Sequence, residues 1–207
     1  MLKSTIKNIF RMAGYDIHRF AARSNPAFQL LQGLKNFNVD LIMDVGANVG
    51  QFALELRSVG YTGYIVSFEP LTSAHSLLCR AASRDQKWEV YKRCAVGHFD
   101  GEIQINIGKS LTTSSILPVN EKLLLATKGA NYVGKETAPI IKLDSISMAY
   151  LSKVKGRAFI KIDTQGFEWE VLDGASVTLK HVQGVLCELS LVSLYDGQHL
   201  WMEIIKR

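Results

Sequence analysis

In the segment "DVGANVGQF", Asp44–Phe52, an apolar run ends and a helical pattern begins. The preceding run, Leu41–Val45, has strand character, and Gln51–Ser58 has helical spacing. Gly46 and Gly50 permit a tight turn between them, because glycine adopts positive φ without steric penalty. A strand, a glycine turn and a helix in this order predict the first βαβ unit of a parallel sheet.

Short apolar runs alternate with helical patterns along most of the chain. The candidate strands are Leu41–Val45, Tyr64–Phe68, Trp88–Val96, Ile103–Ile107, Pro139–Leu143, Ala158–Ile162 and Val185–Leu189. Helical spacing covers Gln51–Ser58, Ser73–Ser83 and Phe167–Leu179. This alternation predicts an α/β fold with a doubly wound, mostly parallel sheet of the Rossmann type.

The length of the chain suits one such domain. It has 207 residues, of which 47% are hydrophobic and 21% charged. We expect a helical arm over residues 1–38 and an α/β domain over residues 39–207. The polar stretch Gly108–Ala138 interrupts the alternation between two candidate strands. It predicts an excursion from the sheet edge, either a lid over a site or an ordinary surface loop.

Composition disfavours several classes of protein. No apolar run reaches the 18 residues of a spanning helix, and the N-terminus lacks the pattern of a signal peptide, so a cytoplasmic location is expected. The cysteines are three, odd in number and far apart, which predicts no disulfide framework. The five histidines are scattered without metal-ligand spacing, so we expect no metal site.

Positive charge is concentrated near the N-terminus. The net charge is +5, and the first 24 residues hold five basic side chains against one acidic one. Lys3, Lys7 and Arg11 recur every four residues while Leu2, Ile6, Ile9 and Ala13 line another face, which predicts a basic amphipathic helix. Such a helix could pack on the main domain or contact an anionic membrane or a partner. The nearly neutral remainder predicts no nucleic-acid binding.

The glycine turn lies where an open parallel sheet binds its ligand, beyond the carboxyl ends of the strands. A dinucleotide fingerprint would need glycine at positions 48 and 51, where this chain has Asn48 and Gln51. With Asp44 at the strand tip, the pattern instead suits a ligand with a cationic centre and an amino-acid end, such as S-adenosylmethionine. Glu69, in "SFEP" at the tip of the next strand, is placed to accept hydrogen bonds from ribose hydroxyls.

Seven segments together resemble the FkbM-type methyltransferases, a class I S-adenosylmethionine-dependent family that typically methylates hydroxyl groups of sugars or natural products. They are "DVGANVGQF", "SFEP", "CAVG", "TTSSIL", "KLDSI", "KIDTQGFEWEVLDGA" and "CELSLVSLYDGQ", and they cover roughly Asp40 to Gln198. The resemblance implies a small-molecule or glycan acceptor. It also implies cofactor-binding roles, with Gly46, Asn48 and Gly50 around the methionine part, Glu69 on the ribose, Ala95 beside the adenine, and Ser115 within reach of cofactor or acceptor.

The candidate catalytic groups are mostly carboxylates at strand tips. Methyl transfer to a hydroxyl needs alignment of acceptor, methyl and sulfur, and removal of a proton. Asp163 ends the strand "AFIKID" and is our first choice of base, with Glu188 at the tip of the next strand as an alternative. Glu168 falls in the first helical turn, where its charge also favours the helix dipole. His199, after "YDGQ", is a further candidate base.

Two other functions stay open from the sequence. A nicotinamide-dependent oxidoreductase is compatible with Glu69 but opposed by the missing glycines. A cofactor-binding or interaction module without turnover is suggested by the 18 residues that follow Val185–Leu189, because class I methyltransferases usually continue with two further strands. We therefore expect a shortened domain in which Val185–Leu189 lies at an uncovered sheet edge, with homo-oligomer formation through that edge.

Overall fold

The computed structural model describes residues 2–12, 14, 25–109, 113–126 and 131–207. Its main sheet has five parallel strands in the order β3-β2-β1-β7-β8. These strands are β1 (Val39–Val45), β2 (Tyr64–Phe68), β3 (Trp88–Val90), β7 (Arg157–Ile162) and β8 (Val182–Cys187). The predicted α/β fold with a parallel, Rossmann-like sheet is therefore confirmed, and the strand order reverses between β1 and β7.

Helices cover both faces of this sheet. On one face, α2 (Pro26–Asn36), α3 (Gln51–Ser58) and α4 (Thr72–Ala82) pack on Ile42 of β1 and Ile65 of β2. On the other face, α6 (Ser147–Leu151) and α7 (Glu168–Asp173) pack on Met43 and on Ile160 of β7. Neighbouring residues of one strand thus enter different cores, as the two-residue period of a strand requires.

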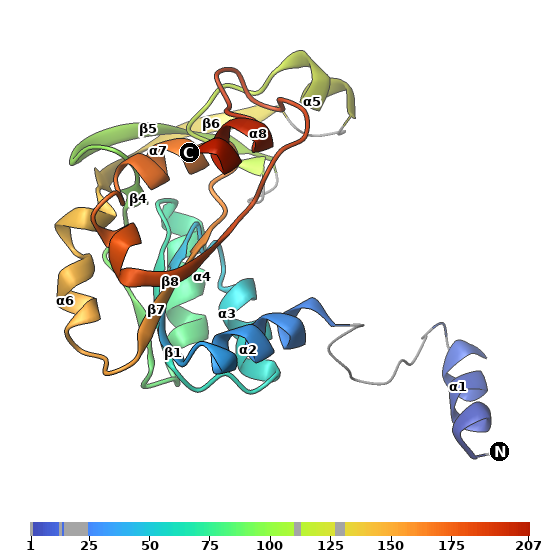
Figure 1. Cartoon of the computed structure of the whole chain (residues 1–207). Helices are drawn as coiled ribbons and strands as arrows, with labels where there is room; N and C mark the ends of the chain where they lie inside the picture. Colours follow the sequence, from blue (N-terminus) through green and yellow to red (C-terminus); the bar gives the residue numbers. More distant parts are fainter. Residues whose placement is uncertain (1, 13, 15–24, 110–112, 127–130) are drawn as a thin grey trace.

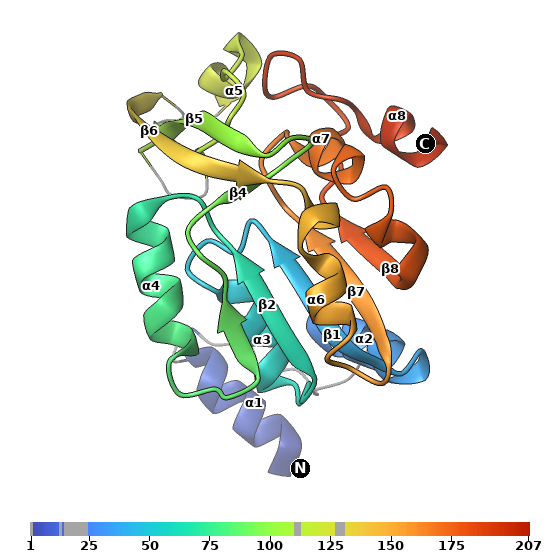
Figure 2. The ribbon, with the colours of Figure 1, turned by 90° about the vertical axis from the view of Figure 1, so that its left-hand side faces the viewer.

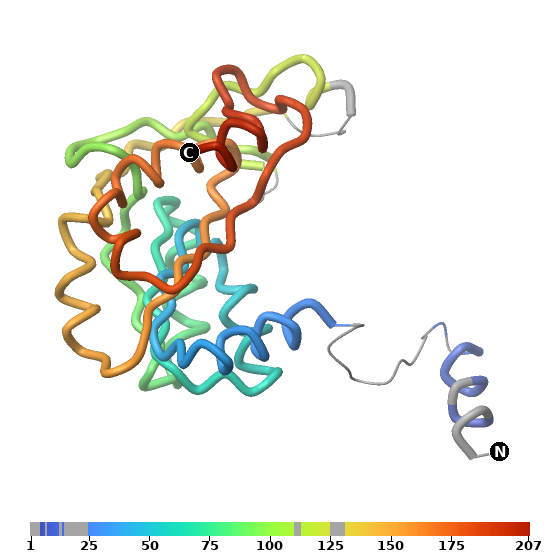
Figure 3. The backbone as a smooth tube through the Cα atoms, in the orientation of Figure 1, coloured from blue at the N-terminus to red at the C-terminus, as the bar shows by residue number. Residues whose placement is uncertain are grey.

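The expected arm over residues 1–38 consists of two different parts. The helix α1 (Leu2–Met12) lies apart from the α/β body (Figures 1 and 3). By contrast, α2 belongs to the body, because Leu31 and Leu34 are buried in the same cluster as Val39 and Ile42. Asn25 caps α2 by accepting a hydrogen bond from the backbone nitrogen of Phe28.

A second, smaller sheet lies across the carboxyl ends of the main strands (Figure 2). It has the order β4-β6-β5, formed by β4 (Ala95–Val96), β5 (Gly101–Gly108) and β6 (Tyr132–Ile141). The prediction of one strand over Trp88–Val96 is therefore wrong, because β3 and β4 belong to different sheets. Arg93 lies between them, and its guanidinium donates to Pro70 O at 2.8 Å and pairs with Glu136 of β6 at 3.0 Å, which draws the chain out of the main sheet.

The polar segment expected as an excursion over residues 108–138 is partly strand. β5 and β6 form an antiparallel pair that aligns Gly101 with Ile140 and Gly108 with Tyr132, so the excursion is reduced to the connection between them. Within that connection lies α5 (Glu121–Ala126). Ser115 returns to the hairpin through an antiparallel bridge to Asn106. The expectation of an extended run over Pro139–Leu143 also ends early, since a 3-10 turn, η3 (Leu143–Ser145), begins at Leu143.

The last third of the chain differs from the predicted elements in two places. The helix expected over Phe167–Leu179 stops at Asp173, because Asp144 binds the backbone beyond it: Asp144 N donates to Gly174 O at 2.9 Å, and Asp144 Oδ1 accepts from Thr178 N at 2.7 Å. A 3-10 turn, η4 (Thr178–His181), then leads into β8. β8 is the outermost strand of the main sheet, as expected for Val185–Leu189, and α8 (Trp201–Lys206) follows it.

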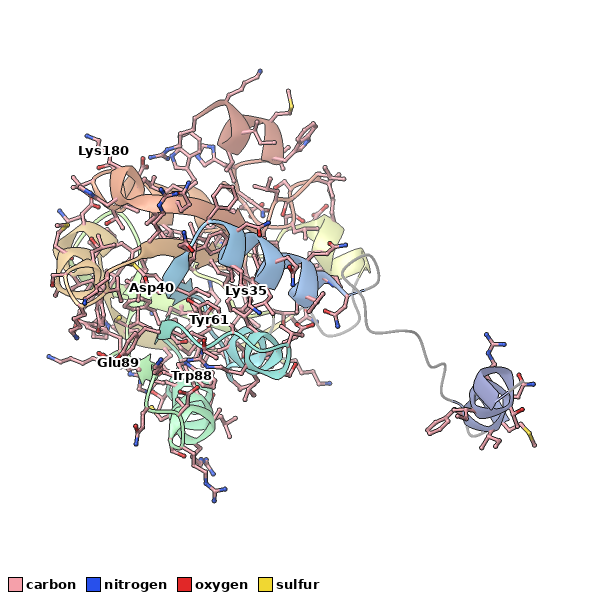
Figure 4. The ribbon with its side chains drawn as sticks, turned by 60° about the horizontal axis from the view of Figure 1, so that its bottom comes forward. Lys35, Asp40, Tyr61, Trp88, Glu89 and Lys180 are labelled. Carbon is pink, nitrogen blue, oxygen red and sulfur yellow. The ribbon has the colours of Figure 1, made fainter. Side chains whose placement is uncertain are left out.

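The end of the sheet opposite the glycine turn carries its own polar groups (Figure 4). There, Asp40 Oδ2 accepts a hydrogen bond from Gly156 N at 2.9 Å and ties β1 to the start of β7. Tyr61 is buried beside Asp40, and Lys35 of α2 lines the same small cavity. Across the described ranges, no helix combines the length and apolar character that crossing a bilayer demands.

Gly46 lies in one of the two closest backbone contacts found at glycines of the described residues, the other being that of Gly174 with Gly97. The φ of Gly46, +72°, is in the left-handed region, and a Cβ built there would lie 1.8 Å from the backbone oxygen of Asp163 at the tip of β7. The glycine therefore lets the turn after β1 lie directly against β7.

We expect Gly46→Ala to lower the free energy of unfolding by about 2 kcal/mol or more, because it combines left-handed strain with a backbone clash. Urea denaturation followed by circular dichroism would measure the loss. Gly33→Ala is the matched control, since Gly33 lies within α2 with nothing within 4 Å of its added Cβ. This control should stabilise the protein by about 0.5–1 kcal/mol. Equal urea midpoints for Gly46→Ala and the parent would contradict the close contact between Gly46 and the Asp163 backbone.

Candidate active site

A cavity of about 450 Å³ lies between the glycine turn and the small sheet. Its volume is within the roughly 300–1,000 Å³ range of small-molecule sites. The walls come from the turn after β1, the tips of β2 and β7, and residues of β4 and β5. Six of the ten residues predicted for the site line it, namely Gly46, Asn48, Glu69, Ala95, Ser115 and Asp163.

The glycine turn presents a backbone made rigid by the neighbouring strand. Gly46 N and Ala47 N both donate to Phe68 O, at 3.1 and 3.0 Å. Asn48 has a φ of +50°, and its side-chain Oδ1 is buried with no hydrogen-bond partner among the described residues. Gly50, also left-handed, does not line the cavity; a Cβ there would lie 2.8 Å from the Trp88 ring. Gly50 thus serves the packing of the turn, whereas Asn48 offers an acceptor to a ligand.

Glu69 is a buried carboxylate held by two backbone donors. Its Oε2 accepts from Asn48 N and its Oε1 from Leu71 N, each at 2.9 Å. Burial raises the pKa of Glu69 to about 7, although these two hydrogen bonds act in the opposite direction. Both oxygens keep capacity for a further hydrogen bond from a ligand.

A buried lysine, Lys161 of β7, lies below the turn and was not singled out from the sequence. Its Nζ is 2.9 Å from Gly46 O, 3.2 Å from Asp44 Oδ1 and 3.7 Å from Asp163 Oδ2. The signal was present, because Lys161 interrupts an apolar strand two residues before Asp163 and so shares its face. The ammonium links β1 to β7 and neutralises charge on both carboxylates.

Asp44 lies behind the turn and does not line the cavity. It is fully buried, and its Oδ2 accepts from Ser67 Oγ at 3.1 Å. Ser67 Oγ in turn accepts from Trp88 Nε1 at 2.9 Å, so the network reaches from β7 to β3. Burial raises the pKa of Asp44, while Lys161 opposes that shift. The structure thus gives Asp44 a supporting position in this network.

Three side chains form a polar cluster at the tips of β7 and β8. Gln165 Nε2 donates to Asp163 Oδ1 and to Glu188 Oε2, each at 2.9 Å, which brings the two carboxylates together. Gln165 has a φ of +55°, uncommon for a residue other than glycine, and Tyr195 and Ser115 hold it. Tyr195 donates from its hydroxyl to Gln165 Oε1 at 3.2 Å, and Ser115 Oγ donates to Gln165 O at 2.6 Å.

Glu188, in this cluster, has a raised pKa. Partial burial, followed by the hydrogen bonding and negative charge of Asp163, raises the pKa of Glu188 to about 7. Glu188 does not line the cavity, whereas Asp163 and Gln165 do. The cluster therefore offers a carboxylate that can exchange a proton near neutral pH.

Glu168 and His199, the other two candidate catalytic residues, make contacts outside the carboxylate cluster. Glu168 is buried, and its Oε1 accepts from Thr164 N at 2.9 Å and Gly166 N at 3.1 Å, so it stabilises the loop after β7. His199 does not line the cavity; its ring stacks on Trp169 at 4.2 Å. Within residues that the structure describes, no three histidine, cysteine or acidic side chains are grouped as a metal site would require.

We expect Lys161→Met to destabilise the fold by about 3 kcal/mol, because it leaves Asp44 buried without a countercharge. Urea unfolding would measure this loss. Lys35→Met, at an exposed lysine of α2, should change stability by less than about 0.5 kcal/mol. The double variant Asp44→Asn, Lys161→Met should recover much of the loss. A single Lys161→Met variant as stable as the parent would show that this ion pair contributes nothing to folding.

Comparisons with known proteins agree with this architecture. The family model described as the methyltransferase FkbM domain matches residues 44–207, which is more than half of the chain. Methyltransferase sdnD of Sordaria araneosa is 27% identical over 154 residues, an alignment that covers 64% of this chain and 59% of that protein. The chain therefore matches less than two thirds of that relative's length.

The matched segment begins at Asp44, near the end of β1, and contains every residue that lines the cavity. It includes the buried Glu69 and the cluster around Gln165. The chain belongs to the FkbM methyltransferase family.

Proposed function

We propose that this chain binds S-adenosylmethionine in the cavity and transfers its methyl group to a hydroxyl of a small-molecule or glycan acceptor. The observation that carries this proposal is that Asn48 and Glu69 line the same cavity as Asp163 and Gln165, and that Gln165 joins Asp163 to Glu188. Family membership supports the reaction class, and the name of the fungal relative supports it too.

The cavity residues fit this cofactor. The unpartnered Oδ1 of Asn48 can accept a hydrogen bond from an α-ammonium group, and Glu69 can accept from ribose hydroxyls. Ala95 and Ile105 provide apolar surface for a planar base. When bound, S-adenosylmethionine supplies an electrophilic methyl group on a sulfonium centre.

The chain itself must orient the acceptor and take up its proton. We infer that Glu188 is the proton acceptor, because Gln165, which lines the cavity, donates to it at 2.9 Å and because its pKa is raised to about 7. Asp163 is 3.7 Å from Lys161 Nζ, so its negative charge is compensated, and Gln165 holds it beside Glu188. Asp163, our first choice from the sequence, thus becomes the group that tunes Glu188.

A screen identifies the acceptor. The chain is incubated with methyl-labelled S-adenosylmethionine and an extract of the source cell, and mass spectrometry locates the labelled product. Appearance of a labelled hydroxyl compound supports the proposal. Tight cofactor binding with no labelled product would favour a binding module instead, and binding of a nicotinamide nucleotide in place of S-adenosylmethionine would favour an oxidoreductase.

We expect Glu69→Ala to weaken S-adenosylmethionine binding at least tenfold, since hydrogen bonds to charged groups contribute about 1.5–3 kcal/mol each. Isothermal titration calorimetry would measure the dissociation constant. Glu102→Ala is the control, because Glu102 is exposed on β5 and does not line the cavity. A Glu69→Ala variant that binds as tightly as the parent would remove the ribose role from Glu69.

Turnover should fall as the pH is lowered through about 7, because protonated Glu188 cannot accept a proton. The rate is measured at saturating cofactor, so that the titration of Glu69, whose pKa is also raised to about 7, does not alter occupancy. Glu188→Gln should lower turnover by about 10²–10⁴ and abolish this pH step.

The pH dependence of turnover in Asp163→Asn, compared with that in Glu188→Gln, shows which carboxylate takes the proton. If Glu188 takes the proton, Asp163→Asn should keep a pH step but move it to lower pH, since removing the neighbouring negative charge lowers the pKa of Glu188. If instead Asp163→Asn loses both turnover and the pH step while Glu188→Gln retains them, Asp163 is the base.

A further inference from the structure

The N-terminal helix α1 has two chemically distinct faces that the proposed reaction does not use. Helical spacing places Leu2, Ile6 and Ile9 on one face, with Phe10 at its edge. The same spacing places Lys3, Lys7 and Arg11 along the adjoining face, and α1 contains no acidic residue. An apolar stripe bordered by a row of basic residues therefore runs along the helix.

The apolar face of α1 is not part of either core. Ile9 is 60% and Met12 89% exposed, and Ile6 and Phe10 are exposed as well. Figures 1 and 4 show α1 apart from the α/β body. A helix of 11 residues is marginal in water without a surface to pack on, since its stability comes mainly from burial of an amphipathic face.

Charge indicates which surface fits this helix. A second copy of α1 would bring two basic rows together, which is unfavourable. An anionic lipid surface accepts both features, because the apolar side chains enter the boundary between headgroups and acyl chains while the basic side chains reach anionic headgroups. The matching is specific to α1, since the rest of the chain is nearly neutral.

We propose that α1 attaches this protein peripherally to an anionic lipid surface, with the helix axis parallel to the membrane plane. The interaction is reversible, because one short amphipathic helix buries a limited apolar area. Electrostatic attraction contributes, so binding weakens as ionic strength rises. This proposal is independent of the reaction, because α1 contributes no residue to the cavity.

Vesicle flotation of the full chain tests the proposal. Vesicles of phosphatidylcholine alone are compared with vesicles containing phosphatidylcholine and phosphatidylglycerol. We expect the protein to float with the anionic vesicles and to be released by high salt. Far-UV circular dichroism should show a gain in helix only with the anionic vesicles. Equal flotation with both vesicle types, or none with either, would overturn the proposal.

Variants within α1 separate the two faces. Ile6→Gln, Ile9→Gln should lower binding by at least tenfold through loss of apolar burial while retaining helix propensity. Lys3→Gln, Lys7→Gln should lower it by about fivefold for each charge removed, and only with anionic vesicles. Asn8→Gln, on the polar side, is the matched control and should bind like the parent. Flotation that the first two variants leave unchanged would show that α1 is not the attachment site.

Two further measurements check the alternatives. S-adenosylmethionine affinity, measured by calorimetry, should be the same in every α1 variant, which shows that the α/β body is intact. Light scattering without lipid should give the same mass for parent and Ile6→Gln, Ile9→Gln. A multimer that only this variant dissociates would assign the apolar face to a second copy of the chain and overturn the lipid assignment.

Discussion

The ion pair between Lys161 and Asp44 is the interaction on which the geometry of the site depends. It joins β7 to β1 beneath the glycine turn, and the same ammonium donates to Gly46 O at 2.9 Å. Removing two charges from water is unfavourable unless hydrogen bonds satisfy both groups. Ser67 donates a hydrogen bond to Asp44, and Trp88 donates one to Ser67. The polar network therefore spans four strands of the sheet.

Close contacts with neighbouring protein atoms shape the turn above this network. Gly46 lies against the carbonyl of Asp163, and Gly50 lies against the ring of Trp88. These two glycines therefore have a packing reason that is independent of cofactor binding. Asn48 lies between them, where its left-handed backbone directs a backbone nitrogen to Glu69 and leaves Oδ1 without a partner. Packing thus prepares the groups that a ligand would contact.

The small sheet forms one wall of the cavity, and the segment that follows β5 contacts the carboxylate cluster. Ala95 of β4 and Ile105 of β5 line the wall, while Ser115 reaches from the connection after β5 to the backbone of Gln165. Gln165 then bridges Asp163 and Glu188. The segment that the sequence shows as a polar interruption of the strand pattern therefore helps to position the carboxylate pair. Its residue Ser115 also helps to hold Gln165 at a positive φ that is uncommon for a residue other than glycine.

The parallel sheet and the glycine turn could be predicted from the sequence, as could the positions of Glu69, Asp163 and Glu188 at strand tips. Alternation of strand and helix patterns and the position of a residue at a strand tip are local properties. The sequence also predicted that β8 would be an outer strand. Three features became apparent only in the folded chain: Trp88–Val96 divides between two sheets, α2 joins the body, and Gln165 bridges Asp163 and Glu188. These features depend on contacts between residues far apart in the chain, such as Arg93 with Glu136, and no local pattern encodes such a pairing.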